Sequence, residues 1–186
     1  MNIVFFNALS ELEKARLFFP VDDFVFARIV RSEKDWNSFK QFAQQNHGQK
    51  FCAVLEKTDS RLVQKARQAD FLVGILGKSP KHCLFCVQQK IDFLFQPFGF
   101  GRSAWDLSIL RIAKQNKVNV GLFFSDVLNA LPRERIKWFE NAFFLGLFCR
   151  KMKVGLVAFS GAFSFEETRC QEDLKSFQEL LLEGFS

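Results

Sequence analysis

The residues of this sequence whose types and spacing could do chemistry begin with a cysteine pair, Cys83 and Cys86, which directly follows His82. A Cys-x-x-Cys spacing lets two thiolates bind one zinc ion, but a structural zinc site needs about four ligands. The chain has only two histidines, His47 and His82, and no second close cysteine pair. We therefore expect buried thiols that behave as small apolar side chains, and we assign no metal site.

Phosphate-binding or acyl-transfer chemistry would need other groups. No GxGxxG follows the first expected strand, and GxxxxGK[ST] does not occur in the chain. Small residues after a late strand of a barrel can bind phosphate, and Ser160-Gly161-Ala162 has that position, although a tight turn would look the same. A serine nucleophile needs a neighbouring base, and neither histidine is placed to serve. We assign no catalytic residue.

Basic residues are concentrated in the middle of the chain. Residues 50–153 contain 18 basic and 8 acidic residues, whereas residues 1–49 contain six of each and residues 154–186 contain 2 basic and 6 acidic ones. A basic surface attracts a phosphate-rich partner because each neutralised phosphate releases a condensed counterion. The same charges can simply solvate helix faces, so composition leaves both interpretations open. The 26 Phe residues indicate a bulky apolar core.

Short apolar runs alternate with longer stretches of helical periodicity, and Ser32, Asp59, Pro80 and Pro132 mark helix starts. The expected strands are 2–8, 23–30, 50–56, 71–76, 92–98, 118–124 and 153–160, and the expected helices start near residues 10, 32, 59, 80, 104, 132 and 170. In the helix that begins at Pro132, we expect the core to be contacted by Ile136, Phe139, Phe143 and Leu147.

Seven βα units with strongly apolar strands predict an α/β fold in which helices cover a parallel sheet. An eight-unit barrel typically needs about 250 residues. For 186 residues we therefore expect a compact or incomplete TIM-like (β/α) barrel, with residues 1–186 forming a single domain. An open doubly wound sheet is the alternative architecture.

The stretch IDFLFQPFGFGRSAWDLSILRIAKQNKVNVGLFFSDVLNALPRERIKWFENAF (91–143) goes further than composition. It resembles the ribonuclease P protein component 3 family of archaea, whose eukaryotic relatives are the thirty-kilodalton ribonuclease P subunits. Ile91-Asp92-Phe93 is similar to the family's VDI-type run, Arg102 to the arginine of its loop, and Trp105-Asp106-Leu107 to its IDH helix start. Residues 118–122 are similar to its VALEF-type strand, and Ser125, Val127 and Leu128 to the S-x-LL motif that follows. Later in the chain, residues 159–162 are similar to its SSGA turn, and Arg169 with Asp173-Leu174 to its LRSP-x-DL segment.

The resemblance implies a barrel without catalytic residues or a cofactor of its own. Proteins of this family assist a catalytic RNA, which uses Mg²⁺ to remove the 5′ leader from precursor tRNA. The implied partners are ribonuclease P RNA, precursor tRNA, protein component 2 (in a heterodimer or heterotetramer) and other ribonuclease P proteins. The holoenzyme is an endoribonuclease, hence a hydrolase and a nuclease, whose active site is RNA.

Arg102 is the leading candidate for an RNA contact. It lies in a loop between glycines after an expected strand, and its planar guanidinium can hold a phosphate by two parallel hydrogen bonds. Arg169 is the second candidate on the same resemblance. Asp106 is expected in the first turn of its helix, where it interacts with the helix dipole. Weaker candidates are Lys78, Lys81, Arg111 and Lys114.

Two other functions stay open at this stage. The first is a barrel phosphoesterase or phosphate-binding metabolic enzyme, in which Ser160-Gly161-Ala162 grips phosphate. The second is a protein-only scaffold whose Phe-rich surfaces bind proteins inside a ribonucleoprotein complex. The odd number of five cysteines, and the acidic residues right after the first short apolar run, predict reduced thiols, no membrane partner and a cytoplasmic location.

Overall fold

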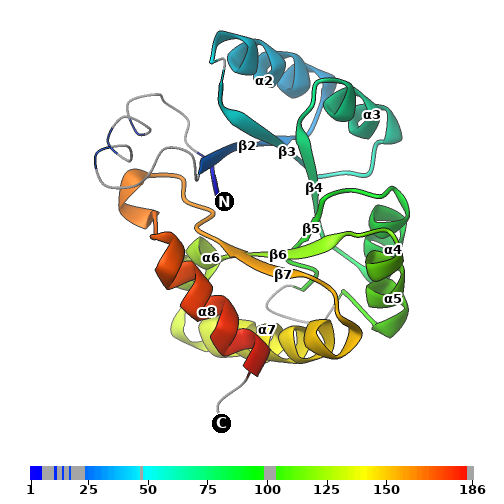
Figure 1. Cartoon of the computed structure of the whole chain (residues 1–186), viewed down its shortest axis with the longest axis vertical. Helices are drawn as coiled ribbons and strands as arrows, with labels where there is room; N and C mark the ends of the chain where they lie inside the picture. Colours follow the sequence, from blue (N-terminus) through cyan, green and yellow to red (C-terminus); the bar gives the residue numbers. More distant parts are fainter. Residues whose placement is uncertain are drawn as a thin grey trace.

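The structure is a computed structural model that describes residues 1–5, 11, 14, 17, 24–46, 48–98 and 104–183. Seven parallel strands pair in the order in which they occur along the chain. The sheet curls into a nearly closed barrel with helices on its outside, as Figure 1 shows from one end. The strands are β1 (Asn2–Val4), β2 (Phe24–Val30), β3 (Lys50–Leu55), β4 (Leu72–Leu76), β5 (Phe93–Phe95), β6 (Asn119–Phe123) and β7 (Leu156–Phe159).

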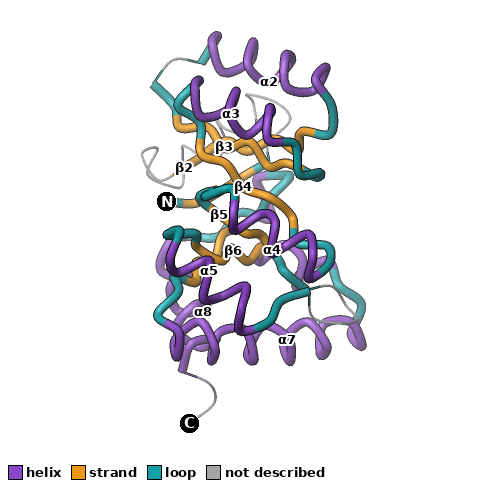
Figure 2. The backbone as a smooth tube through the Cα atoms, turned by 90° about the vertical axis from the view of Figure 1, so that its right-hand side faces the viewer, coloured by secondary structure: helices purple, strands orange, loops and turns teal. Residues whose placement is uncertain are grey.

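The helices lie around the strands in a single outer layer, which is visible from the side in Figure 2. They are α2 (Glu33–Gln45), α3 (Ser60–Gln68), α4 (Pro80–Gln88), α5 (Leu107–Gln115), α6 (Phe124–Asn129), α7 (Pro132–Met152) and α8 (Gln171–Glu183), with a short 3-10 helix η2 (Phe165–Glu167) before α8. The predicted class, an α/β TIM-like barrel with seven parallel strands, is confirmed.

The barrel is joined where β7 meets β1. The N–H of Phe5 donates to the carbonyl of Ala162 at 2.7 Å, and Val4 forms a parallel bridge to the same residue. The buried side chain of Asn2 bonds Ser160 twice: its amide nitrogen lies 2.9 Å from Ser160 Oγ, and its oxygen accepts from the Ser160 N–H at 2.9 Å. Because the first and last strands are linked, the open doubly wound alternative is wrong.

Aromatic rings fill the inside of the barrel. Phe95 is fully buried, and its ring stacks on that of Phe123 with centroids 4.6 Å apart. Two neighbouring strands make room for it: a Cβ on Gly74 would lie 2.0 Å from Phe95 Cε2, and one on Gly121 would lie 2.4 Å from Phe95 Cδ1. The interior cluster also contains Phe5, Phe93 and Phe159. A barrel of few strands is narrow, and these rings occupy its interior.

Most helix starts follow the sequence signals. Ser32 caps α2 by accepting from the Asp35 N–H at 3.3 Å, and Asp59 caps α3 by accepting from the Arg61 N–H at 2.9 Å. Proline occupies the first turn of α4 and of α7, where its missing N–H costs no hydrogen bond. These local interactions fix where each helix begins and hence how it lies on the sheet.

The predicted core face of α7 was wrong at its two ends. Ile136 is 62% exposed and Leu147 is 46% exposed, as is Phe144 at 62%. The helix is apolar on several sides, so its sequence permits more than one stripe. Close packing against α8 selects among them, because a Cβ on Gly146 would lie 2.2 Å from the Leu181 carbonyl oxygen. The buried face therefore consists of Trp138, Ala142, Leu145, Gly146 and Cys149.

Several element boundaries also differ from expectation. β5 ends at Phe95 rather than residue 98, because Gln96 takes a left-handed conformation with φ +43° and Pro97 follows. α5 begins at residue 107 and not near 104, with Asp106 as its cap rather than in its first turn; the Asp106 carboxylate accepts from the Ile109 N–H at 2.9 Å. Helix α6 was not expected, and β1 ends at residue 4, whereas residues 6–10 lie outside the described part.

We expect Gly74→Ala to destabilise the protein by about 1–3 kcal/mol, because the new methyl group would overlap the packed Phe95 ring. Chemical denaturation measures the loss. In the double variant Gly74→Ala/Phe95→Leu the cost should be smaller than the sum of the two single costs, since the smaller side chain yields space. Strict additivity would show that the ring does not depend on this glycine.

Candidate nucleic-acid interface

The carboxyl ends of the strands are apolar on the inside of the barrel. Barrel enzymes place their catalytic groups at this end. Here the interior positions at or beside the strand ends belong to Phe5, Leu76, Phe95, Phe123 and Phe159. Within the described ranges, no group of three or more His, Cys, Asp or Glu side chains is placed to hold a metal ion. These interior positions therefore offer apolar side chains for packing rather than ligands for a metal ion.

The Cys83–Cys86 pair belongs to the core. Both side chains are buried, as the sequence predicts, and burial raises the pKa of the Cys83 thiol to about 11 and that of the Cys86 thiol to about 12. His82 Nδ1 lies 3.8 Å from Cys86 Sγ, and burial lowers the pKa of this imidazole. At neutral pH the thiols stay protonated, so they neither attack electrophiles nor bind metal readily.

The turn formed by Ser160-Gly161-Ala162 is occupied by structural hydrogen bonds. The Ser160 N–H donates to Asn2 Oδ1 at 2.9 Å, and the Gly161 N–H donates to the Ile3 carbonyl at 3.0 Å. The Ser160 hydroxyl accepts from the Arg169 N–H at 2.9 Å. A phosphate-binding turn must offer free N–H groups. These contacts favour the tight-turn interpretation over a phosphate grip.

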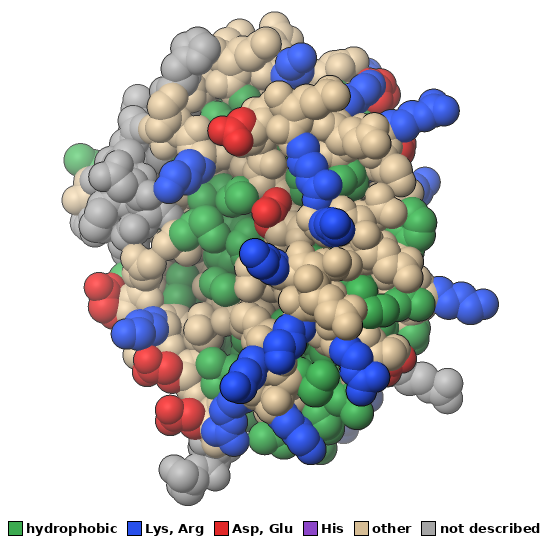
Figure 3. All heavy atoms as spheres, turned by 45° about the vertical axis from the view of Figure 1, so that its right-hand side comes forward, with side chains coloured by type: hydrophobic (Ala, Val, Ile, Leu, Met, Phe, Trp, Pro, Cys, Tyr) green, Lys and Arg blue, Asp and Glu red, His purple; other side chains and the backbone are tan. Residues whose placement is uncertain are grey.

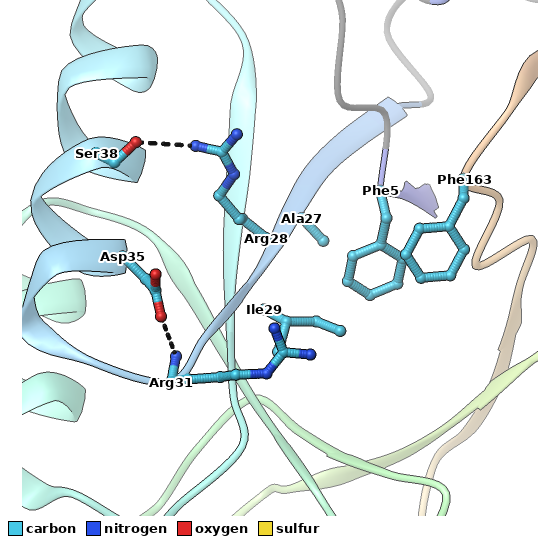
Figure 4. Close-up of a pocket in the computed structure, with 8 residues that line it drawn as sticks. All are labelled: Phe5, Ala27, Arg28, Ile29, Arg31, Asp35, Ser38 and Phe163. Atoms are coloured by element: carbon cyan, nitrogen blue, oxygen red, sulfur yellow. Dashed lines mark hydrogen bonds between the residues drawn. The ribbon is translucent and has the colours of Figure 1, made fainter.

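A cavity of about 410 Å³ opens beside the second half of β2. β1 pairs with β2 at Phe24–Phe26, and the cavity lies beside the part of β2 that follows this pairing. Figure 4 shows two arginines at its edge: the Arg28 guanidinium bonds Ser38 Oγ at 3.3 Å, and the Arg31 N–H donates to Asp35 Oδ2 at 3.0 Å. The cavity is lined by Phe5, Ala27, Arg28, Ile29, Arg31, Asp35, Ser38 and Phe163.

Two basic side chains share one carboxylate at the end of the barrel where the strands end, which we call the carboxyl rim. Glu56 follows β3 and accepts from Arg31 Nε at 2.8 Å and from Lys78 Nζ at 3.0 Å. The hydrogen bond from Lys78 contributes most, and that from Arg31 next, to holding the pKa of the Glu56 carboxyl below its usual range. Exposed ion pairs such as these add little stability. Their main effect is to place two cations close together at the carboxyl ends of β2 and β4.

The predicted contact residues do not form one cluster. Lys78 lies at the carboxyl rim, and Lys81 is exposed in the first turn of α4 at the same rim. Arg111 and Lys114 are exposed on α5, as expected from its apolar stripe, and Lys114 belongs to the last turn of that helix. Arg102 lies outside the described residues. These RNA contacts stay predictions.

Arg169 is committed to internal contacts. Its guanidinium donates to the carbonyls of Thr168 at 2.9 Å and Glu166 at 3.2 Å, and it lies over the ring of Phe124 at 5.6 Å. The side chain is only partly exposed. An arginine held in this way can still present one edge to a phosphate, but its position is set by the β7–α8 connection.

The sequence interpretation missed Arg28 and Arg31, although Arg31 directly follows an expected strand and thus had the position of a functional residue. It also missed Asp126, which lies in α6 after β6. Burial raises the pKa of the Asp126 carboxyl above its ordinary value, and the nearby Gln96 amide opposes part of this rise. Burial of this carboxyl could not be read from the sequence, because helix α6 was itself unexpected.

Comparison with known proteins gives a result at the level of the fold. No protein-family model matches the sequence, and no curated protein matches it. A chain in the cryo-EM structure of archaeal ribonuclease P with mature tRNA superposes with a TM-score of 0.72 over 97% of this chain and 82% of that chain. The two are 18% identical, so the likeness establishes a common fold.

Two enzyme structures share the barrel more distantly. One is a crystal structure of an amidohydrolase, with a TM-score of 0.54 and 12% identity, and the other is a prolidase complexed with N-methylphosphonate-L-proline, with a TM-score of 0.50 and 9% identity. This chain corresponds to 43% and 40% of their lengths, respectively. None of the described helices combines the length and the hydropathy that crossing a bilayer requires.

We expect Asp126→Asn to raise the free energy of unfolding at pH 7. The folded protein holds the Asp126 proton to a higher pH than the unfolded chain, so ionisation at neutral pH costs stability, and the uncharged amide avoids this cost. The gain should shrink as the pH falls toward 3, where both side chains are neutral. Urea denaturation across this pH range measures it.

Asp106→Asn is the matched control with the opposite sign. Hydrogen bonds from Ser108 and then from the Ile109 N–H lower the pKa of the Asp106 carboxyl, so its ionised form stabilises the folded state at neutral pH. This variant should be less stable than the wild type at pH 7. The difference should disappear as the pH falls through the lowered pKa, because the wild-type carboxylate is then protonated. Equal behaviour of the two variants would refute the difference in their surroundings.

Proposed function

We propose that this protein is a non-catalytic subunit of ribonuclease P, which helps a catalytic RNA remove the 5′ leader from precursor tRNA. One observation carries the proposal: the likeness to a chain of archaeal ribonuclease P extends over nearly the whole of this chain and most of the other. The resemblance of residues 91–174 to the component 3 family supports the same conclusion independently of the fold.

The proposal includes finer points that follow from the family. Residues 1–186 act as one barrel domain, and their partners are ribonuclease P RNA, precursor tRNA and protein component 2, among other ribonuclease P proteins. The RNA uses Mg²⁺ for the endonucleolytic hydrolysis, and the protein binds no cofactor. The five free cysteines, four of them buried, support a reducing, cytoplasmic location.

The carboxyl rim supplies a physical basis for RNA binding. Arg31, Lys78 and Lys81 are exposed there, and Arg102 is predicted to join them. Repulsion between phosphates opposes the folding of RNA, and cations fixed on a protein surface lower that repulsion. The interior positions at the strand ends are occupied by apolar side chains, which supports a role in which the barrel assists the RNA through its outer surface.

One observation favours the protein-only scaffold as a second candidate. Ile136, Phe144 and Leu147 expose large apolar side chains on α7, and exposed apolar surface of this kind often marks a protein contact. A scaffold would bind its protein partners without affinity for RNA. Binding of the isolated protein to ribonuclease P RNA therefore separates the two candidates.

Reconstitution tests the proposed function. The protein is added to ribonuclease P RNA with and without protein component 2, and the rate of 5′-leader removal is measured at limiting Mg²⁺. Arg102→Ala should lower this rate severalfold while the melting temperature is unchanged, because one bidentate phosphate contact is lost. Arg102→Lys tests whether charge alone suffices. Unchanged cleavage by the alanine variant would remove Arg102 from the interface.

Glu56 provides a test in the opposite direction. Glu56→Gln should tighten RNA binding, because it removes the anion that neutralises Arg31 and Lys78, whereas Lys78→Gln should weaken binding about fourfold at 0.15 M salt. Fluorescence anisotropy with labelled ribonuclease P RNA measures both. Glu179→Gln, which removes a carboxylate paired with Lys175 on α8, is the control and should change nothing. Weaker binding by Glu56→Gln would contradict the location of the interface.

A further inference from the structure

Three successive βα units place a lysine at the same special backbone position. Lys90 lies between α4 and β5, Lys117 between α5 and β6, and Lys153 between α7 and β7. All three are exposed, and all three have left-handed backbone conformations, with φ of +54°, +58° and +56°. The amino-terminal ends of β5, β6 and β7 thus carry one cation each, whereas the connection between α3 and β4 has Asp70 at this position, with φ of +58°.

Pairing of the strands brings these lysines side by side. The Asn119 N–H donates to the Asp92 carbonyl at 3.0 Å, and the Val120 N–H donates to the Gly155 carbonyl at 2.7 Å. Neighbouring strands lie about 5 Å apart. Lys90, Lys117 and Lys153 therefore form a row along the amino-terminal rim, which we call the lysine row.

The backbone at these positions favours glycine over lysine. Helices commonly end with a left-handed residue, usually Gly and sometimes Asn, because any Cβ is disfavoured there. Two of the lysines complete such an ending: the N–H after Lys117 bonds the Ala113 carbonyl at 2.8 Å, and the N–H after Lys153 bonds the Cys149 carbonyl at 2.9 Å. A cation near a helix carboxyl end is favourable, but α5 and α7 already have basic residues in their last turns.

Further basic residues extend the lysine row. Arg67 reaches from α3 to the α4–β5 connection, where its guanidinium donates to the carbonyls of Gln89, at 3.0 Å, and Lys90. Lys114 and Lys151 are exposed in the last turns of α5 and α7. Figure 3 shows Lys and Arg side chains running across the lower middle of the face that includes this side of the barrel. Among the described residues, no carboxylate forms an ion pair with any lysine of the row.

We propose that the lysine row binds the phosphodiester backbone of RNA, as a second contact surface at the opposite end of the barrel from Arg31 and Lys78. Regularly spaced point charges on long flexible stems suit a chain of phosphates and read no sequence. The choice of RNA as the polyanion rests on the proposed function; the binding surface itself rests on the geometry of the row.

The test uses the full chain with all three lysines changed together. Each phosphate contact raises affinity at 0.15 M salt by roughly fourfold, so Lys→Gln at positions 90, 117 and 153 should weaken RNA binding by about 50-fold and lower the log–log salt slope by about 2. Fluorescence anisotropy is measured with ribonuclease P RNA and with an unrelated structured RNA of equal length. Both RNAs should lose affinity alike.

Two further variants separate binding from folding. Lys→Gly at the same three positions removes the charges and relieves the left-handed strain, so the melting temperature should not fall while RNA affinity falls as in the Gln variant. Lys→Gln at exposed Lys40, Lys137 and Lys175, which lie outside the first and last turns of α2, α7 and α8, removes equal charge elsewhere and should weaken binding much less. Equal losses in the two Gln variants would show a diffuse charge effect and overturn the proposal.

The outcomes also distinguish this inference from the proposed function. If the wild-type protein stimulates 5′-leader removal and the Lys→Gln row variant binds RNA and stimulates equally well, the lysine row is refuted and the proposed function stands. If the wild-type protein leaves cleavage unchanged but RNA binding depends on the row, the proposed function fails and the row stands. An unchanged salt slope in the row variant counts against the row in either case.

Discussion

Packing of phenylalanine rings inside a seven-stranded barrel is the constraint on which the rest of this structure depends. Phe95 needs glycines on both neighbouring strands, and it stacks on Phe123, while Phe5 lies at the seam where β1 and β7 meet. These rings occupy the places from which a barrel enzyme reaches its substrate. Burial of these rings stabilises the barrel, and the basic side chains described above lie on its outside.

Those outer surfaces differ in character. The carboxyl rim groups Arg31 and Lys78 around Glu56, beside a cavity edged by Arg28, and the opposite rim carries the lysine row. At the carboxyl rim Glu56 pairs with both cations, whereas no carboxylate among the described residues forms an ion pair with the lysine row; α7 exposes apolar side chains. The function that we propose would use both kinds of surface, with cations contacting phosphates and apolar side chains contacting proteins.

Much of the fold could be predicted because its signals are local. Apolar runs, caps such as Ser32 and Asp59, and Pro80 set the order and the starts of the elements without reference to distant residues. The buried face of α7 could not be predicted in this way, because which of its apolar stripes faces the core depends on the close approach of α8 to Gly146. The site was harder to predict: Glu56 follows β3, and the two cations that pair with it follow β2 and β4. The left-handed lysines are recognised as a group only once neighbouring strand ends are aligned.

We propose that the protein acts on RNA through its surface charge. The most direct test is the affinity of the unmodified protein for ribonuclease P RNA over a series of salt concentrations. We expect the logarithm of the binding constant to fall linearly with the logarithm of the salt concentration, with a slope of about −3 or steeper, because several phosphates are neutralised at each rim. A slope near zero, at any affinity, would show that RNA phosphates are not what this surface binds.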